Sequence, residues 1–114
     1  MKKITLLFFF FFAALNTFAQ DVTGDWKGSL QVPGAELHLV LHITKTDNGL
    51  SAILDSIDQK ALGIPVTETT FENSTLKFSV KNLTIEYEGV LDKNQVITGT
   101  FKQMGHSLPL ILKR

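Results

Sequence analysis

Apolar and polar residues alternate along most of the sequence after residue 20. The clearest case is the segment 36–45, where Leu37, Leu39, Leu41 and Ile43 occupy every second position. A period of two places these side chains on one face of a strand, whereas helical spacing is not seen over more than a turn or two. The pattern therefore predicts an all-β fold with strands over 23–32, 36–45, 50–56, 66–71, 76–81, 85–91, 96–103 and 106–113.

The connections between these expected strands are short and rich in turn residues. Asp47-Asn48-Gly49 is typical of a tight hairpin, because glycine accepts the positive φ that such a turn needs. About eight strands joined in this way predict an antiparallel meander, either an up-and-down barrel or a nearly closed sheet pair. The longest irregular connection is expected at 57–65. Because Pro109 cannot donate a ladder hydrogen bond, the last strand is expected to have an edge or a bulge there.

The first residues have a different character. Two lysines precede an apolar run of 12 residues, 4–15, and small residues precede a cleavage point after Ala19. This arrangement is typical of a secretory signal peptide, and the run is shorter than the roughly 20 residues of a membrane-spanning helix. We expect a signal peptide at 1–19, a single domain at 20–114 and no membrane span after cleavage. The protein should be exported to the periplasm or the cell exterior.

Charge and motifs narrow the classes of function. The chain after the signal peptide carries 9 basic and 11 acidic residues without a run of one sign, which argues against nucleic acid as a partner. Since it has no cysteine and none of the common nucleophile, zinc, phosphate-loop or dinucleotide motifs, we expect no enzymatic activity and no cofactor. On a strand, His38 and His42 stand roughly 13 Å apart, too far to share a metal ion. We expect two surface histidines, with Asp55 and Asp58 as solvated carboxylates.

Trp26 stands between Gly24 and Gly28, which let neighbouring backbone approach its indole closely. Two interpretations stay open: a buried core residue, or the floor of a ligand-binding barrel. Gly24-Asp25-Trp26 resembles the G-x-W signature of lipocalins, and ITGTF at 97–101 is similar to an avidin-type strand. In the second interpretation, a free-standing barrel binds a small apolar ligand among Trp26, Phe78, Tyr87 and Phe101.

Three short patterns predict glycosylation sites. Asn73 and Asn82 each begin an N-x-S/T sequon within an expected turn. Asp55-Ser56-Ile57 resembles the motif used for periplasmic O-glycosylation in Bacteroidetes. That resemblance makes Ser56 a candidate acceptor.

A broader resemblance spans nearly the whole domain and rests on the order of seven segments. They are GDWKG at 24–28, LHLVLHI at 37–43, LDSIDQ at 54–59, GIPV at 63–66, YEG at 87–89, ITGTFKQMG at 97–105 and LPL at 108–110. This order is similar to the N-terminal module of secreted α/β-hydrolases, serine-aminopeptidase or esterase-like, from Bacteroidetes. In that family every catalytic residue belongs to a following domain, which this sequence lacks.

The resemblance implies a non-catalytic accessory module that interacts with an α/β-hydrolase domain in cis or in trans. A docking module should present an apolar patch on its outside, which we expect in the connecting loop at Ile57, Leu62, Ile64 and Val66. Residues 113–114 would then be linker. A ligand carrier should instead have an internal cavity and a polar exterior.

Overall fold

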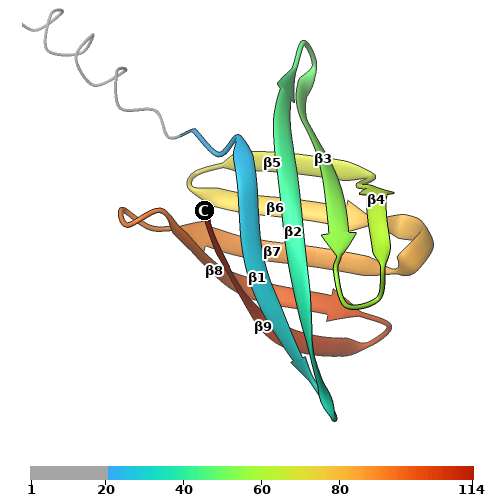
Figure 1. Cartoon of the computed structure of the whole chain (residues 1–114). Coiled ribbons are helices and arrows are strands. Elements are labelled where there is room, and N and C mark those ends of the chain that lie inside the picture. Colours follow the sequence, from blue (N-terminus) through green and yellow to red (C-terminus); the bar gives the residue numbers. More distant parts are fainter. Residues whose placement is uncertain (1–20) are drawn as a thin grey trace, which may run out of the picture.

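The computed structural model describes residues 21–114, so the predicted signal peptide at 1–19 lies outside the described residues. The described chain forms nine antiparallel strands in one sheet (Figure 1). They are β1 (Gly24–Val32), β2 (Ala35–Thr46), β3 (Gly49–Ser56), β4 (Ala61–Pro65), β5 (Glu68–Glu72), β6 (Thr75–Val80), β7 (Ile85–Leu91), β8 (Val96–Gln103) and β9 (His106–Lys113). A single 3-10 turn, η2 (Lys81–Leu83), joins β6 to β7. Within residues 21–114 there is no helix with the length and apolar character needed to cross a bilayer.

The sheet is a meander that curls into a half-barrel. The strand order is β4-β3-β2-β1-β9-β8-β7-β6-β5, so the first and last strands are neighbours and the open edges belong to the consecutive strands β4 and β5. In Figure 1 the layer of β1–β4 crosses over the layer of β5–β8. The chain passes from one layer to the other at two adjacent residues, since Val66 N–H donates to Ala52 O (3.2 Å) and Thr67 N–H to Ser79 O (2.7 Å). The predicted all-β antiparallel meander is confirmed.

The prediction of an irregular connection at 57–65 was wrong, because this segment contains a strand in addition to the eight that were predicted. Ala61–Pro65 forms β4 against β3. Gly63 and Pro65 hide the alternation in the sequence, yet both suit an edge strand: Pro65 needs no partner on the open side, and Gly63 adopts φ 73° at a bulge. Leu54 pairs with Ile64 and Ser56 with Ala61, which leaves two residues of β4 opposite the single residue Asp55.

The core fills the space between the two layers with side chains from all nine strands. Apart from Val22, which precedes β1, its buried members lie on seven of them: Trp26, Leu30, Leu39, Leu41, Ile43, Ala52, Leu54, Leu76, Phe78, Val80, Ile85, Tyr87, Leu91, Ile97, Phe101, Leu110 and Leu112. Phe71 on β5 and Ile64 on β4 pack against this cluster from the two open edges. The alternation seen in the sequence therefore places the predicted apolar faces inside.

Arg114 and Trp26 close one end of the half-barrel. The Trp26 indole N–H donates to Val22 O (2.9 Å), and the Arg114 guanidinium lies 4.3 Å from the centroid of the Trp26 ring. The guanidinium also donates to the carbonyl oxygens of Asp21 and Thr23. The expectation that residues 113–114 are linker was wrong, because Lys113 belongs to β9 and Arg114 covers the core tryptophan.

The joint between β1 and β9 is close but irregular. Its only registered pair is Lys27 with Lys113. A Cβ added at Gly28 would lie 2.4 Å from Ile111 O, so glycine is what permits the two backbones to approach here. β9 is therefore not an edge strand, and Pro109 is accommodated on its outer face, opposite Thr100 of β8 and away from the one registered pair with β1.

Candidate functional site

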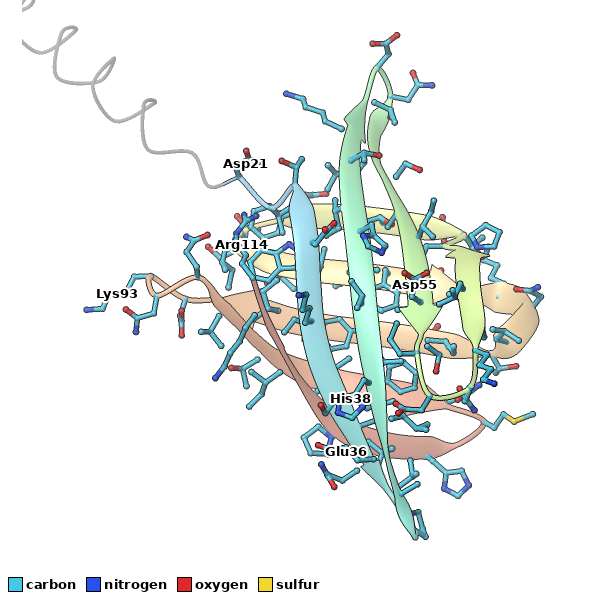
Figure 2. All side chains as sticks on the ribbon, viewed as in Figure 1. Asp21, Glu36, His38, Asp55, Lys93 and Arg114 are labelled. Atoms are coloured by element: carbon cyan, nitrogen blue, oxygen red, sulfur yellow. The ribbon has the colours of Figure 1, made fainter. Side chains whose placement is uncertain are left out.

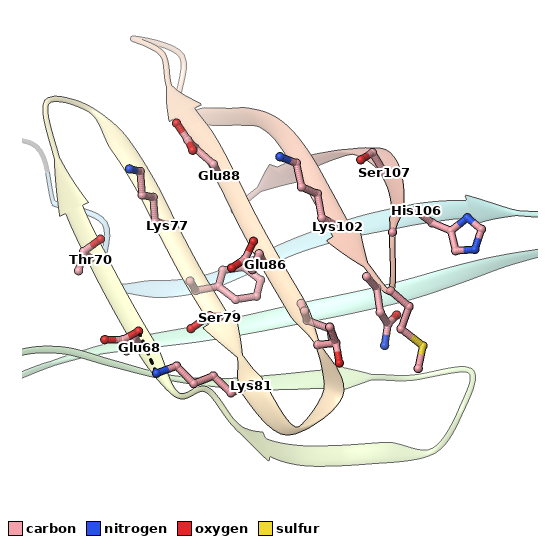
Figure 3. A pocket seen from close by; sticks show the side chains of 16 residues that line it. Glu68, Thr70, Lys77, Ser79, Lys81, Glu86, Glu88, Lys102, His106 and Ser107 are labelled. Carbon is pink, nitrogen blue, oxygen red and sulfur yellow. Dashed lines mark ion pairs between the residues drawn. The ribbon is translucent and has the colours of Figure 1, made fainter.

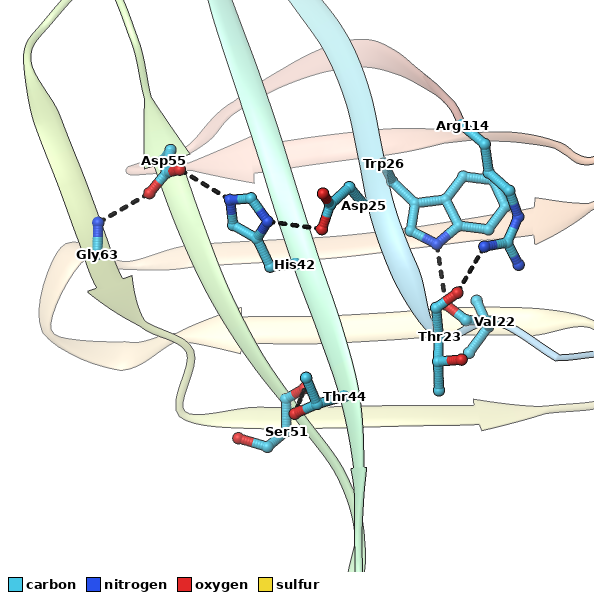
Figure 4. A network of polar contacts seen from close by, with 10 residues as sticks. All are labelled: Val22, Thr23, Asp25, Trp26, His42, Thr44, Ser51, Asp55, Gly63 and Arg114. Atoms are coloured by element: carbon cyan, nitrogen blue, oxygen red, sulfur yellow. Dashed lines mark hydrogen bonds and ion pairs between the residues drawn. The ribbon is translucent and has the colours of Figure 1, made fainter.

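A chain of polar contacts crosses the outer face of the β1–β4 layer and centres on His42 (Figure 4). His42 Nδ1 lies 2.7 Å from Asp25 Oδ1 on β1, and His42 Nε2 lies 2.8 Å from Asp55 Oδ2 on β3. The other Asp55 oxygen accepts the Gly63 backbone N–H at 2.8 Å, in the bulge of β4. Four adjacent strands are thus joined by side chains as well as by the backbone ladder.

These contacts favour a protonated His42. Hydrogen bonds to Asp55 and then Asp25 raise the pKa of His42, while the Gly63 N–H and then His42 lower the pKa of Asp55. An imidazolium can donate from both nitrogens at once, whereas a neutral imidazole has only one N–H. Since both nitrogens are engaged by carboxylates, His42 has no free nitrogen with which to accept a substrate proton.

A second histidine–carboxylate pair holds the loop between β3 and β4. Asp58 Oδ2 accepts the His38 backbone N–H (2.6 Å) and lies 2.9 Å from His38 Nδ1. These bonds, the backbone one first, lower the pKa of Asp58. The Ile57 N–H donates to His38 O (2.9 Å). Asp58 and Ile57 are therefore fixed to β2 rather than left in a free loop. Figure 2 labels His38, the residue of β2 that holds them.

Beside His38 an open groove runs over the outer face of β2, β1 and β9. Its apolar lining comes from Val40, Ile57, Pro109 and Ile111, which belong to segments far apart in the sequence. Lys27, Lys113 and Arg114 lie along one part of the groove. Both Ile57 and Ile111 are 47% exposed, so the groove leaves apolar side-chain surface in contact with water.

The four residues predicted for a docking loop separate into two pairs. Ile57 and Leu62 are exposed, Leu62 at 66%, as the prediction requires. Ile64 and Val66 instead pack against the core. The exposed apolar surface continues from Ile57 onto β2 and β9. Sequence reasoning missed Val40 and Ile111 because each occupies the outer position of a strand whose inner face is more apolar.

The aromatic residues considered for a ligand site all lie in the packed core: Trp26, Phe78, Tyr87 and Phe101. The rings of Phe78 and Tyr87 stack with their centroids 5.2 Å apart. The Tyr87 hydroxyl donates to Leu110 O (2.9 Å), and burial raises the pKa of this phenol. These contacts suit structural residues that fill the half-barrel.

The predicted modification sites differ in accessibility. Asn73 and Asn82 are exposed, one in the β5–β6 turn and the other in η2. Ser56 is 4% exposed, and its hydroxyl donates to Gln59 Oε1 at 2.7 Å. The folded structure therefore does not present Ser56 to a modifying enzyme, which speaks against O-glycosylation of the folded protein at this residue.

The outer face of β5–β8 is also hollowed, and most of the residues that line this hollow are polar or charged (Figure 3). Its charges alternate in sign across strands: Lys77 is paired in register with Glu88, and Glu86 with Lys102. Glu68 Oε1 lies 3.8 Å from Lys81 Nζ. Opposite charges are therefore neighbours across the strands of this surface, and Glu68 and Lys81 form an ion pair there.

The described residues do not assemble a familiar catalytic or metal site. Residues 21–114 contain no group of three or more His, Cys, Asp or Glu side chains placed to hold a metal ion. Ser29 lies opposite His38 in the β1–β2 register, but no hydrogen bond joins the two side chains. A serine activated by His38 would require that contact. The apolar groove and the histidine–carboxylate contacts beside it are the features from which a function can be argued.

Comparison with known proteins adds no relative to this half-barrel: no family model matches the chain, and no curated protein or solved structure matches it significantly.

Proposed function

We propose that this protein is a non-catalytic interaction module that docks a protein domain in the groove lined by Val40, Ile57, Pro109 and Ile111. The groove itself is the observation that carries the proposal, because it exposes apolar surface on the outside of a domain whose inside is filled by core side chains. An exposed apolar patch of this kind is typical of a protein interaction site. A carrier of small apolar ligands would be expected to have the opposite distribution.

The groove is also more rigid than a surface loop. Ile57 is held by its own N–H bond to His38 O, and its neighbour Asp58 by two bonds to His38. Val40, Pro109 and Ile111 lie on strands of the sheet. Because the wall is preorganised, little conformational entropy is lost when a partner binds.

An α/β-hydrolase domain is the partner that we propose, in cis or in trans. Support for this choice comes from the resemblance of the seven sequence segments to the module that precedes such domains. The groove supports docking in general, and it suits a folded partner with an apolar ridge.

The test is a thermal melt of the protein with and without a separately produced α/β-hydrolase domain of the resembling family. Binding to the folded state raises the melting temperature. We expect an increase for the wild type and its loss in the double variant Ile57→Ser/Ile111→Ser. Val90→Ser is the matched control, because Val90 is 54% exposed on β7 outside the groove.

Two outcomes contradict the proposal at different points. A wild-type melt that is unchanged by the hydrolase domain rejects this partner. Equal binding by the wild type and the double variant rejects the groove as the docking surface.

A further inference from the structure

Two lysines face each other across the joint that closes the sheet. Lys27 and Lys113 form the one registered pair between β1 and β9, and both side chains are exposed on the outer face. Like charges placed directly opposite one another on adjacent strands are destabilising. None of the ion pairs among residues 21–114 involves either lysine, so neither ammonium has a carboxylate of the described chain within ion-pair distance.

The neighbouring cation, Arg114, does not relieve the repulsion between the two lysines. Arg114 follows Lys113 directly, and its guanidinium is held by two carbonyl oxygens and by the Trp26 ring rather than by a carboxylate. The arrangement therefore concentrates positive charge at one place on a domain with more acidic than basic residues. An anionic group from outside would be stabilised there by all three side chains.

This positive site is continuous with the apolar groove. Val40 is the register partner of Lys27 on β2, and Ile111 lies two residues before Lys113 on the same face of β9. Lys27, Lys113, Val40 and Ile111 all line the groove. A group that fits both parts must carry an apolar side chain next to negative charge.

We propose that the groove recognises an acidic segment of the partner protein, with an apolar side chain between Val40 and Ile111 and carboxylates at Lys27 and Lys113. This inference rests on the proposed docking function and adds the chemistry of the partner surface. Exposed charges contribute mostly through steering and specificity, while the apolar contact supplies most of the burial.

The probe is a pair of synthetic peptides, acetyl-Leu-Ile-Glu-Glu-amide and acetyl-Leu-Ile-Gln-Gln-amide, titrated to millimolar concentration into the isotope-labelled protein. We expect the Glu peptide to shift the backbone amide resonances of Lys27, Val40, Ile111 and Lys113. The double variant Lys27→Gln/Lys113→Gln should weaken this binding roughly tenfold, the change expected when two exposed ion pairs are lost. High salt should weaken the wild type in the same direction.

Lys93→Gln is the control, since Lys93 lies in the turn between β7 and β8 and not along the groove. Equal binding of the Glu and Gln peptides, shifts located elsewhere, or no shifts at all would overturn the inference. The same lysine variants in the hydrolase melt separate the two proposals. If the hydrolase domain binds equally to wild type and lysine variant, docking stands and acidic recognition fails. If only the Glu peptide binds, acidic recognition stands with a different partner.

Discussion

The two layers of the half-barrel share a core but present different outer faces. On the β5–β8 layer, Lys77 faces Glu88 and Lys102 faces Glu86, so each registered charge has an opposite neighbour. On the other side, the outer face of β1–β4 and β9, two lysines face each other and an apolar groove lies beside them. The basic side chains on this face that do contact carboxylates are those of His38 and His42.

The two faces differ in whether the charges paired in register are of opposite or of like sign. Opposite charges directly across a strand pair stabilise a sheet, and like charges destabilise it. On the β5–β8 face the registered charges are of opposite sign and therefore favour the sheet. The groove face has like charges opposite one another next to exposed isoleucines, and the docking of an apolar, acidic surface that we propose would relieve both.

The largest expected effect concerns the joint under the groove. Gly28→Ala places a methyl group against Ile111 O and must push β9 away from β1, which should lower the free energy of unfolding by about 2 kcal/mol. Gly99→Ala is the counterpart on the other layer, because its Cβ would meet Glu88 O at 2.2 Å. Denaturant melts should show both losses, and only Gly28→Ala should also weaken binding of the Glu peptide. A fully stable Gly28→Ala protein would mean that the joint can widen freely.

The second effect depends on pH and belongs to the groove face alone. The folded-state pKa of His42 is raised, so its two bonds to carboxylates stabilise the fold below the ordinary histidine value near 6.5, and this contribution is lost as pH rises through the higher folded value. The stability difference between wild type and His42→Gln should therefore be greatest at low pH, until Asp55 protonates. Its size should be roughly 1 kcal/mol or less, because the His42 side chain is 37% exposed.

Chemical denaturation across pH 5 to 9, an interval of about two pH units on either side of neutrality, measures this difference. His106→Gln is the control, because His106 forms no ion pair within residues 21–114. A difference for His42→Gln that grows with rising pH would contradict the proposed bridge.

The smallest expected effect is a change in the free energy of unfolding that has opposite signs on the two faces. Lys27→Gln removes repulsion from Lys113 and should raise the free energy of unfolding by a few tenths of a kcal/mol, whereas Lys77→Gln removes attraction to Glu88 and should lower it by a similar amount. Paired denaturant melts at low salt resolve the two. If both variants shift stability in the same direction, the distinction between the two faces is not electrostatic.

Sequence reasoning succeeded where the signal is local. The alternation over 36–45 predicted both the strand and its buried face, and Gly49 has the positive φ, 135°, that the hairpin expectation required. It failed at β4, whose five residues include Gly63 and Pro65 and show no clear alternation. Whether such a segment forms a strand depends on the partner strand beside it, and β3 supplies that partner.

The candidate site could not be predicted from local sequence patterns either, because it also depends on which strands lie side by side. His42 and Asp55 were each expected to be solvated, yet they meet because the β2–β3 register places Val40 opposite Asp55 and Ile53 opposite His42, one step apart along the sheet. Ile57 was expected at a docking surface, but its neighbours Val40 and Ile111 come from other strands.

The sequence alone specified eight of the nine strands, their inner and outer faces and the tight turn at Asp47-Asn48-Gly49, because these follow from the period of two and from residues close in the chain. The tertiary structure alone decided that β9 pairs with β1, that Arg114 covers Trp26 and that Lys27 meets Lys113. These contacts join residues from the beginning and the end of the domain sequence. They arise because curling of the sheet brings its first and last strands together, and alternation along one strand carries no information about which strand will lie beside it.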